Sequence, residues 1–177
     1  MTWREADHPR DVDGQFTESW ASRLSAALPG GSIFDTFIDP EFGEPSEVMV
    51  EQASDWAHGR FDYTDRTTGY RSRVTGIEHG GDGFNIHGVF EDGDTEIGHY
   101  QIGILKDEDG SRAAVVEGVY LDRDRRGEGL AKRWVARLED VARAEGIKTI
   151  SMWDMSSGFW EHLGYVRGRW SQGSKQL

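Results

Sequence analysis

VVEGVYLDRDRRGEGLAKRWVAR, residues 115–137, joins two different hydrophobic patterns. Apolar and β-branched residues predominate from Ala113 to Leu121, which is typical of a buried strand. A charged turn follows, and then apolar residues recur with the spacing of one helix face, at Leu130, Trp134, Leu138 and Val141. The stretch therefore predicts a strand, a glycine-containing turn and a helix.

The turn carries two glycines, Gly127 and Gly129, where the chain leaves the strand and enters the helix. Glycine lets the backbone approach a ligand closely, and the first N–H groups of a helix lack internal partners and favour an anion. Residues 121–148 contain eight Lys or Arg against six Asp or Glu, in a chain of net charge −12. The turn thus predicts a site for a phosphorylated cofactor, with a tight connection of no further function as the alternative.

Length, composition and charge limit the class of protein. The 177 residues are enough for one domain with a real core, and the absence of cysteine excludes disulfides and thiolate metal sites. No apolar run is long enough for a membrane helix, and the polar N-terminus lacks a signal-peptide pattern, so we expect a cytoplasmic protein. The negative net charge argues against nonspecific binding to nucleic acid or to anionic membranes.

The chain divides into a predicted N-terminal segment, residues 1–31, and one domain, residues 32–177. The segment begins with a highly charged, flexible stretch. Residues 16–28 follow as an amphipathic helix that either packs on its own domain or binds a partner. Residues 8–11 and 15–17 (HPRD and QFT) are similar to a segment of head proteins of actinobacterial phages.

Alternation and turn signals predict the architecture of the domain. A helix is expected at residues 46–58, with Ser46 as its N-cap and Trp56 facing inward. An antiparallel meander follows because four strand patterns are joined by short Gly- and Asp-rich turns, at residues 71–79, 84–91, 96–106 and 112–121.

The second half of the domain continues from the helix that starts in the opening stretch. This helix is predicted to end at Glu145-Gly146, and a strand at residues 148–153 follows, which makes a βαβ crossover with two parallel strands. A short helix at residues 157–163 and a last strand at residues 165–170 complete the order. The predicted fold class is α/β, a layered domain with a mixed, mostly antiparallel sheet.

Two motifs resemble the GCN5-related N-acetyltransferase (GNAT) superfamily. The turn resembles the family's motif A, in which Arg or Gln, then Gly, then Gly or Ala follow a strand; Arg126, Gly129 and Ala131 occupy those positions, with Gly127 in addition. Downstream, residues 159–165 (FWEHLGY) resemble the family's FYEKLGF signature. The resemblance covers residues 70–170 and implies a GNAT-like sheet with a motif A crossover.

The resemblance also implies acetyl-CoA as the acyl donor. In the family the pantetheine arm lies between the two strands that flank the motif A helix and pairs with the backbone of the first. Carried over by position, the pantetheine-binding residues are Val119, Tyr120 and Leu121. The pyrophosphate would be held by residues that we call the motif A cradle: Arg126, Gly127, Glu128, Gly129, Leu130, Ala131 and Lys132.

Three basic residues of this region have alternative roles. Lys132 and Arg133 either reach the adenosine phosphate or are simply solvated on the helix. Arg126 either contacts the cofactor or forms a surface ion pair with Asp122 or Asp124.

Acetyl transfer to an amine needs a base that takes a proton from the ammonium group. Glu117 lies in the predicted strand where apolar neighbours would raise its pKa, and the family often has a glutamate here; the alternative is a carboxylate that faces solvent. Trp160 occupies the position of the family's usual tyrosine, and an indole cannot protonate a leaving thiolate. Solvent or one of three nearby hydroxyl groups would replace it, those of Ser156, Ser157 and Tyr165.

The acceptor side departs from the family pattern. The family usually places two helices between its first and second strands, whereas only residues 80–83 separate the candidate strands here. Either the helix at residues 46–58 forms the wall of the acceptor pocket, with the true first strand near residues 33–38, or the pocket is open. The chain also ends soon after Trp170, with little room for the family's last strand.

The tryptophans and histidines give further predictions, on the core, the acceptor side and metal binding. Trp134 and Trp153 are predicted in the core, and Trp160 and Trp170 on the acceptor side. No metal site is expected, because the strand histidines have no metal-binding spacing.

Two functions remain open. The favoured one is an acetyl-CoA-dependent N-acetyltransferase for a small-molecule or protein amine, such as a polyamine, an aminoglycoside-like amine, a protein lysine or an N-terminus, in a chain that can form a homodimer. The alternative is a noncatalytic GNAT-like module of phage origin that binds CoA or a protein partner. Arg126, Gly127 and Gly129 favour the enzyme, and Trp160 favours the alternative.

Overall fold

The computed structural model describes residues 47–80, 83–106, 112–154, 158–168 and 172–177. The predicted segment 1–31 and the alternative first strand at residues 33–38 lie outside them. The described residues form one eight-stranded sheet of order β1-β2-β3-β4-β5-β6-β8-β7. Its strands are β1 (Tyr63–Thr64), β2 (Arg71–Gly80), β3 (Gly83–Asp92), β4 (Thr95–Lys106), β5 (Arg112–Leu121), β6 (Thr149–Met152), β7 (Val166–Arg167) and β8 (Gly173–Gln176). The helical elements are α2 (Glu47–Phe61) and α3 (Leu130–Ala144), with the 3₁₀ turns η3 (Arg123–Arg125) and η4 (Glu161–Leu163).

The predicted meander and crossover are confirmed. Strands β2 to β5 pair antiparallel with their sequence neighbours, and every boundary lies within one residue of the prediction. Strands β5 and β6 are parallel and are joined by α3. Helix α3 ends as expected, because Glu145 caps it and Gly146 follows with φ 72°. The fold is therefore the mixed α/β layered domain with a mostly antiparallel sheet.

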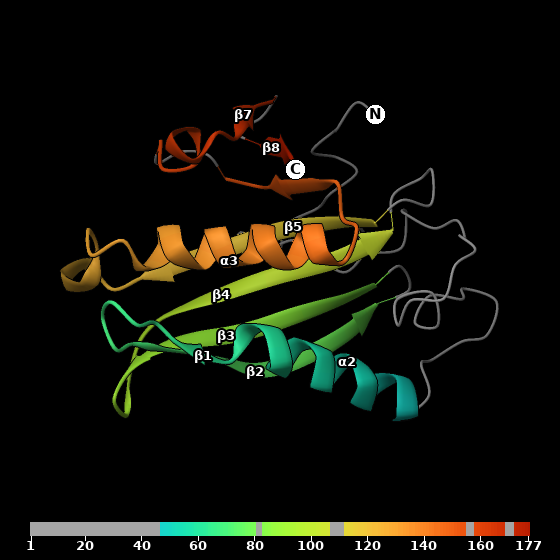
Figure 1. The fold of residues 1–177 in the computed structure, drawn as a ribbon, viewed down its shortest axis with the longest axis horizontal. Helices are drawn as coiled ribbons and strands as arrows, with labels where there is room; N and C mark the ends of the chain where they lie inside the picture. Colours follow the sequence, from blue (N-terminus) through green and yellow to red (C-terminus); the bar gives the residue numbers. More distant parts are fainter. Residues whose placement is uncertain (1–46, 81–82, 107–111, 155–157, 169–171) are drawn as a thin grey trace, which may run out of the picture.

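Both helices cover the same face of the sheet (Figure 1). They share one core with the inward residues of the strands, in which Trp134 from α3 packs on Tyr100 with a ring distance of 4.8 Å. Tyr100 lies across Gly88, where a β-carbon would come within 2.1 Å of the Tyr100 ring. The helix-covered face therefore depends on the absence of a side chain at position 88.

The end of the chain corrects three predictions. A last strand does exist: β8 inserts between β6 and β7, and its residues Gly173 and Lys175 pair with Met152 and Ile150. The helix expected at residues 157–163 is only the 3₁₀ turn η4 in its described part, and the strand expected at residues 165–170 is reduced to β7. The short strand β1 was not predicted. The elements that differ from the prediction, β1, η4, β7 and β8, are two to four residues long and have no hydrophobic periodicity of their own.

Candidate functional site

The sheet opens between β5 and β6, where the resemblance places pantetheine. The two strands pair only from Ala113 with Thr149 to Val116 with Met152. Strand β5 continues for five residues beyond this point without a β6 partner in the described part of the chain. The backbone edge of β5 from Glu117 to Tyr120 is thus left for another extended partner, because strand backbone needs hydrogen-bond partners.

Glu117 lies at the point where the two strands separate. The β4–β5 register shifts there: Gln101 pairs with Gly118 and Ile102 with Val116, which leaves Glu117 as an extra residue in a β-bulge. Its Oε1 is buried and has no hydrogen-bond partner. Burial, with a smaller contribution from the Glu78 carboxylate, raises the pKa of Glu117 to about 7. A carboxyl group with this pKa exchanges protons near neutral pH, as a general base must.

The motif A cradle begins α3. Gly127 and Gly129 have φ of 88° and 77°, which favours glycine, and Gly129 is the N-cap residue. No side chain caps the helix, and its first turn contains no acidic residue. The first N–H groups of α3 therefore lack a competing carboxylate of their own helix, as an anion site requires.

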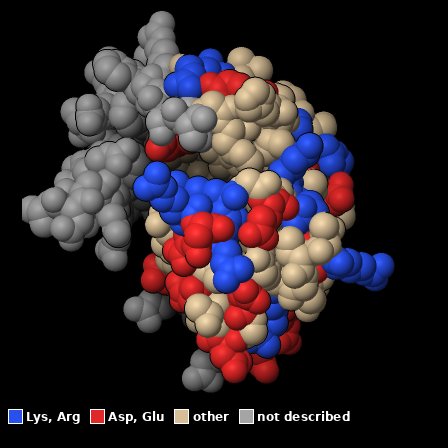
Figure 2. All heavy atoms as spheres, turned by 90° about the vertical axis from the view of Figure 1, so that its left-hand side faces the viewer, with Lys and Arg blue, Asp and Glu red and all other residues tan. Residues whose placement is uncertain are grey.

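Charge is distributed unevenly at this end of the molecule. Figure 2 looks onto it: Lys and Arg side chains gather across the middle of the face, whereas Asp and Glu predominate below them. This agrees with the local excess of basic residues around the cradle in an acidic chain.

Arg126 forms neither of the ion pairs considered for it. Its Nε donates to the carbonyl oxygen of Leu121 over 2.8 Å, and its guanidinium lies 5.3 Å from the centre of the Tyr120 ring. The same ring stacks on His99 from β4 at 5.2 Å. Arg126 is thereby held against the end of β5, and the Leu121 carbonyl, one of the expected pantetheine-binding groups, already has a partner.

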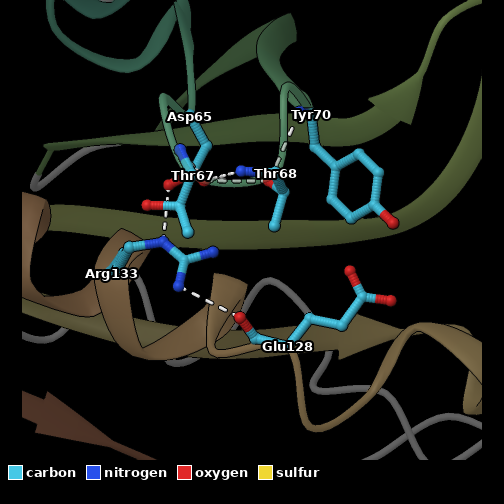
Figure 3. Close-up of polar contacts among 6 residues, drawn as sticks. All are labelled: Asp65, Thr67, Thr68, Tyr70, Glu128 and Arg133. Atoms are coloured by element: carbon cyan, nitrogen blue, oxygen red, sulfur yellow. Dashed lines mark hydrogen bonds and ion pairs between the residues drawn. The ribbon is translucent and has the colours of Figure 1, made fainter.

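Arg133 was considered as a phosphate ligand or a solvated residue, but it braces the cradle (Figure 3). Its Nε donates to Asp65 Oδ2 over 2.6 Å, and its Nη1 donates to the Glu128 carbonyl oxygen over 3.0 Å. Asp65 is 5% exposed and also accepts from the N–H groups of Thr67 and Thr68. Burial alone would raise the pKa of Asp65, but the hydrogen bonds from Arg133 and Thr68 outweigh it and lower the pKa to about 2.

A second connection joins η3 to the same part of the sheet. Arg125 Nη1 donates to Tyr70 Oη over 2.8 Å and lies 3.0 Å from Asp92 Oδ2. Tyr70 directly follows the turn that Asp65 stabilises. The sequence gives no local signal for these contacts, because the partners are 33 to 68 residues apart.

Replacing Asp65 with asparagine should destabilise the protein and loosen the cradle. Asparagine keeps an acceptor for Thr67 and Thr68, so the change removes mainly the ion pair with Arg133. We expect a loss of roughly 2 kcal/mol in the free energy of unfolding, below the full cost of breaking a buried pair because Arg133 is partly exposed. Urea denaturation measures it. Asp140→Asn, which removes an exposed pair with Arg143, is the control and should change stability by less than about 0.5 kcal/mol.

Two aromatic residues of the second motif (residues 159–165), Trp160 and Tyr165, lie in the core, whereas Glu161, His162 and Gly164 are exposed. Trp160 is 6% exposed and packs edge-on against Tyr165 at 5.1 Å, so its expected place on the acceptor side is wrong. Burial, and then the Glu139 carboxylate, raise the pKa of Tyr165 well above its usual value. Tyr165 is therefore unsuited to donate a proton, and Ser156 and Ser157 lie outside the described residues. Trp134 is fully buried as predicted, and Trp153 packs partly buried on Leu105 and Val115.

Helix α2 directly precedes β1 and β2, and only a hairpin joins β2 to β3. Trp56 of α2 faces inward as predicted and packs on Phe84, while Arg60 pairs with Glu145 beyond the end of α3.

Among the described residues, no group of three or more His, Asp or Glu side chains is placed to hold a metal ion. No helix in the described ranges is long and apolar enough to cross a membrane.

Comparison with known proteins identifies the family. Residues 47–165, which are 119 of the 177 residues, match the acetyltransferase (GNAT) family. No curated protein sequence matches the chain. The family match begins at residue 47 and gives no support to a phage-type N-terminal segment.

Solved structures with a similar arrangement include three acetyltransferase-related proteins. Naa50 of Arabidopsis thaliana, in complex with a bisubstrate analogue, has 13% identity and a TM-score of 0.43 over 51% of this chain and 72% of its own. The PaiA N-acetyltransferase of Thermoplasma acidophilum with coenzyme A has 14% identity and a TM-score of 0.43 over 52% and 61%. A variant of the AtaT toxin, bound to the C-terminus of the antitoxin AtaR and to acetyl-CoA, has 14% identity and a TM-score of 0.43 over 52% and 67%. The chain thus spans about 61% to 72% of the length of these proteins.

Two motifs and a family match over most of the described residues lead to the same assignment. The chain belongs to the acetyltransferase (GNAT) family.

Proposed function

We propose that the protein is an N-acetyltransferase that uses acetyl-CoA and transfers the acetyl group directly to an amine. One observation carries the proposal: the unpaired edge of β5 joins a buried carboxyl group at one end to an uncapped helix N-terminus at the other. In acetyl-CoA the thioester, the pantetheine arm and the pyrophosphate follow one another in the same order. The carboxyl group would lie beside the thioester, the strand edge would bind the pantetheine arm, and the helix N-terminus would bind the pyrophosphate.

The residues present fit acetyl-CoA, which would supply the acetyl thioester. The backbone of Val119 and Tyr120 would pair with the pantetheine amides along the unpaired edge. The N–H groups of the motif A cradle would bind the pyrophosphate, with Lys132 exposed beside them. Arg126 would face the phosphates from the Tyr120 side.

Glu117 is the proposed general base. It takes one proton from the acceptor ammonium, which frees the nitrogen lone pair to form a bond with the acetyl carbon. The carbon–sulfur bond breaks as the amide forms. The nitrogen releases its second proton and the thiolate takes one up through solvent, since neither Trp160 nor Tyr165 can serve as the acid.

The test is a calorimetric titration of the full chain with acetyl-CoA and with CoA, followed by a thiol-release assay with a panel of amines. Micromolar binding of acetyl-CoA and amine-dependent thiol release would support the proposal. Binding without release for any amine would favour the second candidate, a noncatalytic CoA-binding module, for which the buried Trp160 in place of tyrosine is the specific observation. Absence of binding at millimolar cofactor would refute the cradle.

A further inference from the structure

One histidine outside both sequence motifs contacts the strand that is expected to bind pantetheine. His99 of β4 pairs with Tyr120 of β5, and their rings stack with centres 5.2 Å apart and planes at 22°. Their neighbours Tyr100 and Val119 belong to the helix-covered core, so His99 and Tyr120 lie on the opposite face of the sheet. Directly opposed aromatic pairs stabilise antiparallel strands. His99 therefore helps to fix the Tyr120 ring at the open end of β5.

The two strands approach closely beside this pair. Gly98 of β4 pairs with Leu121 of β5, and a β-carbon on Gly98 would collide with the carbonyl oxygen of Tyr120. Any other residue at position 98 would push β4 away from β5 and separate the two rings. The glycine thus keeps the His99 ring against the Tyr120 ring.

Arg126 contacts the same Tyr120 ring from the motif A cradle. Its guanidinium carbon lies 5.3 Å from the ring centre, within the range of a cation–π interaction, and its Nε donates to the Leu121 carbonyl oxygen. In the part of the chain that the structure describes, Arg126 forms no ion pair, and its two terminal nitrogens donate to no protein group. The side chain is therefore anchored by its Nε and by the Tyr120 ring, and both terminal amino groups are left for a ligand.

An arginine that is already ordered binds an anion more tightly than a mobile one. A long surface side chain loses rotamer freedom when a ligand immobilises it, which lowers the affinity by about 2- to 13-fold. The contacts of Arg126 with Tyr120 and Leu121 remove part of this cost before the ligand arrives. His99 contributes indirectly, because it holds the ring on which the guanidinium lies.

We propose that His99 is a positioning residue for binding of the cofactor phosphates. It holds Tyr120, the Tyr120 ring holds the guanidinium of Arg126, and the terminal nitrogens of Arg126 donate to the pyrophosphate. This inference rests on the proposed function, because it takes the anion to be the pyrophosphate of acetyl-CoA. The order of the Arg126 side chain can nevertheless be measured without the cofactor.

The first measurement is the NMR signal of the Arg126 Nε–H group in the full chain without cofactor. In the wild type this group should be ordered, with a heteronuclear NOE close to that of the backbone. His99→Ala should lower the NOE, and His99→Phe, which keeps an aromatic ring at position 99, should leave it high. His162→Ala, which removes an exposed histidine of η4, is the control and should not change it.

The second measurement is a double-mutant cycle on the affinity for CoA. His99→Ala should weaken CoA binding about fivefold, as expected when one side chain has to be ordered on binding, and His99→Phe should bind as the wild type does. In the Arg126→Ala background, His99→Ala should have no further effect, because the side chain that it positions is gone. An equal loss in both backgrounds would indicate a general effect on the sheet and would overturn the proposal.

The two measurements separate this inference from the proposed function. If the wild type and His99→Ala bind CoA equally well, or if the Arg126 NOE is unchanged in His99→Ala, the positioning role is wrong although the protein binds the cofactor. If the NOE responds as expected but the wild type does not bind CoA, the proposed function is overturned, and with it the pyrophosphate as the ligand of Arg126.

Discussion

Glu117→Gln is expected to lower kcat by roughly 100-fold or more while leaving the affinity for acetyl-CoA unchanged. General base catalysis contributes about 10² to 10⁴ in rate, and glutamine has nearly the same shape but cannot take a proton. Position 117 lies at the bulge where β5 separates from β6, so the substitution leaves the unpaired backbone edge and the motif A cradle intact. Steady-state thiol release and a calorimetric titration measure the two quantities separately.

The role of Glu117 as a base also predicts in which direction the reaction rate changes with pH. A base must be ionised, and burial raises the pKa of Glu117 from 4.5 to about 7. In the wild type, kcat/KM should therefore rise about tenfold per pH unit below pH 7 and level off above it. The residual activity of Glu117→Gln should lack this step. A wild-type profile without a step between pH 6 and 8 would contradict the role of Glu117.

The same substitution should stabilise the protein. A carboxyl group whose pKa is raised on folding favours the folded state at low pH, and this contribution is lost as the pH rises through about 7. Glu117→Gln removes the cost of burying the charge, so at pH 8 it should be more stable by roughly 2 kcal/mol, and near pH 4 by almost nothing. Glu96→Gln, on the exposed part of β4, should change neither activity nor stability. Loss of activity together with loss of stability would instead indicate misfolding.

The meander was predictable because its signals are local. Residues 83–92 alternate between buried and less buried side chains, and Gly- and Asp-rich turns separate the strands, so each boundary could be inferred from a few neighbouring residues. The crossover was predictable for the same reason: a strand pattern, a helix pattern ending at Gly146 and a further strand pattern follow one another.

The parts that were missed depend on distant partners. Strand β8 reads GSKQ and carries no alternation, and it forms because β6 offers an edge to Gly173–Gln176. The bulge at Glu117 arises from the pairing of β5 with β4. The alternation of apolar and polar residues along β5 alone therefore does not predict which face of the sheet the Glu117 side chain is on. For Arg133 the sequence left two roles open, contact with the adenosine phosphate or solvation, and neither includes its observed hydrogen bond with Asp65, 68 residues earlier.

Gly129→Leu should weaken acetyl-CoA binding at least 100-fold. Gly129 has φ 77°, and a β-carbon there would come within 2.8 Å of Arg133 Nη1. That guanidinium cannot move freely, because Asp65 and the Glu128 carbonyl oxygen hold it. The leucine side chain would therefore displace the loop from the start of α3. Loss of two charge-assisted hydrogen bonds to pyrophosphate costs about 3 kcal/mol, which corresponds to roughly 100-fold in affinity.

The matched control lies at the other end of the same helix. Gly146 has φ 72° and nothing within 4 Å of a β-carbon, so Gly146→Leu introduces the same backbone strain without touching the cradle. Both variants should lose about 1 to 2 kcal/mol of stability from the left-handed conformation, but only Gly129→Leu should lose affinity for the cofactor. If the two variants bind acetyl-CoA equally well, the pyrophosphate does not sit at the start of α3. If both lose binding equally, the effect is one of stability, and the cradle has to be tested by calorimetry on the Arg126→Ala variant, which removes the cation proposed to face the phosphates without straining the backbone.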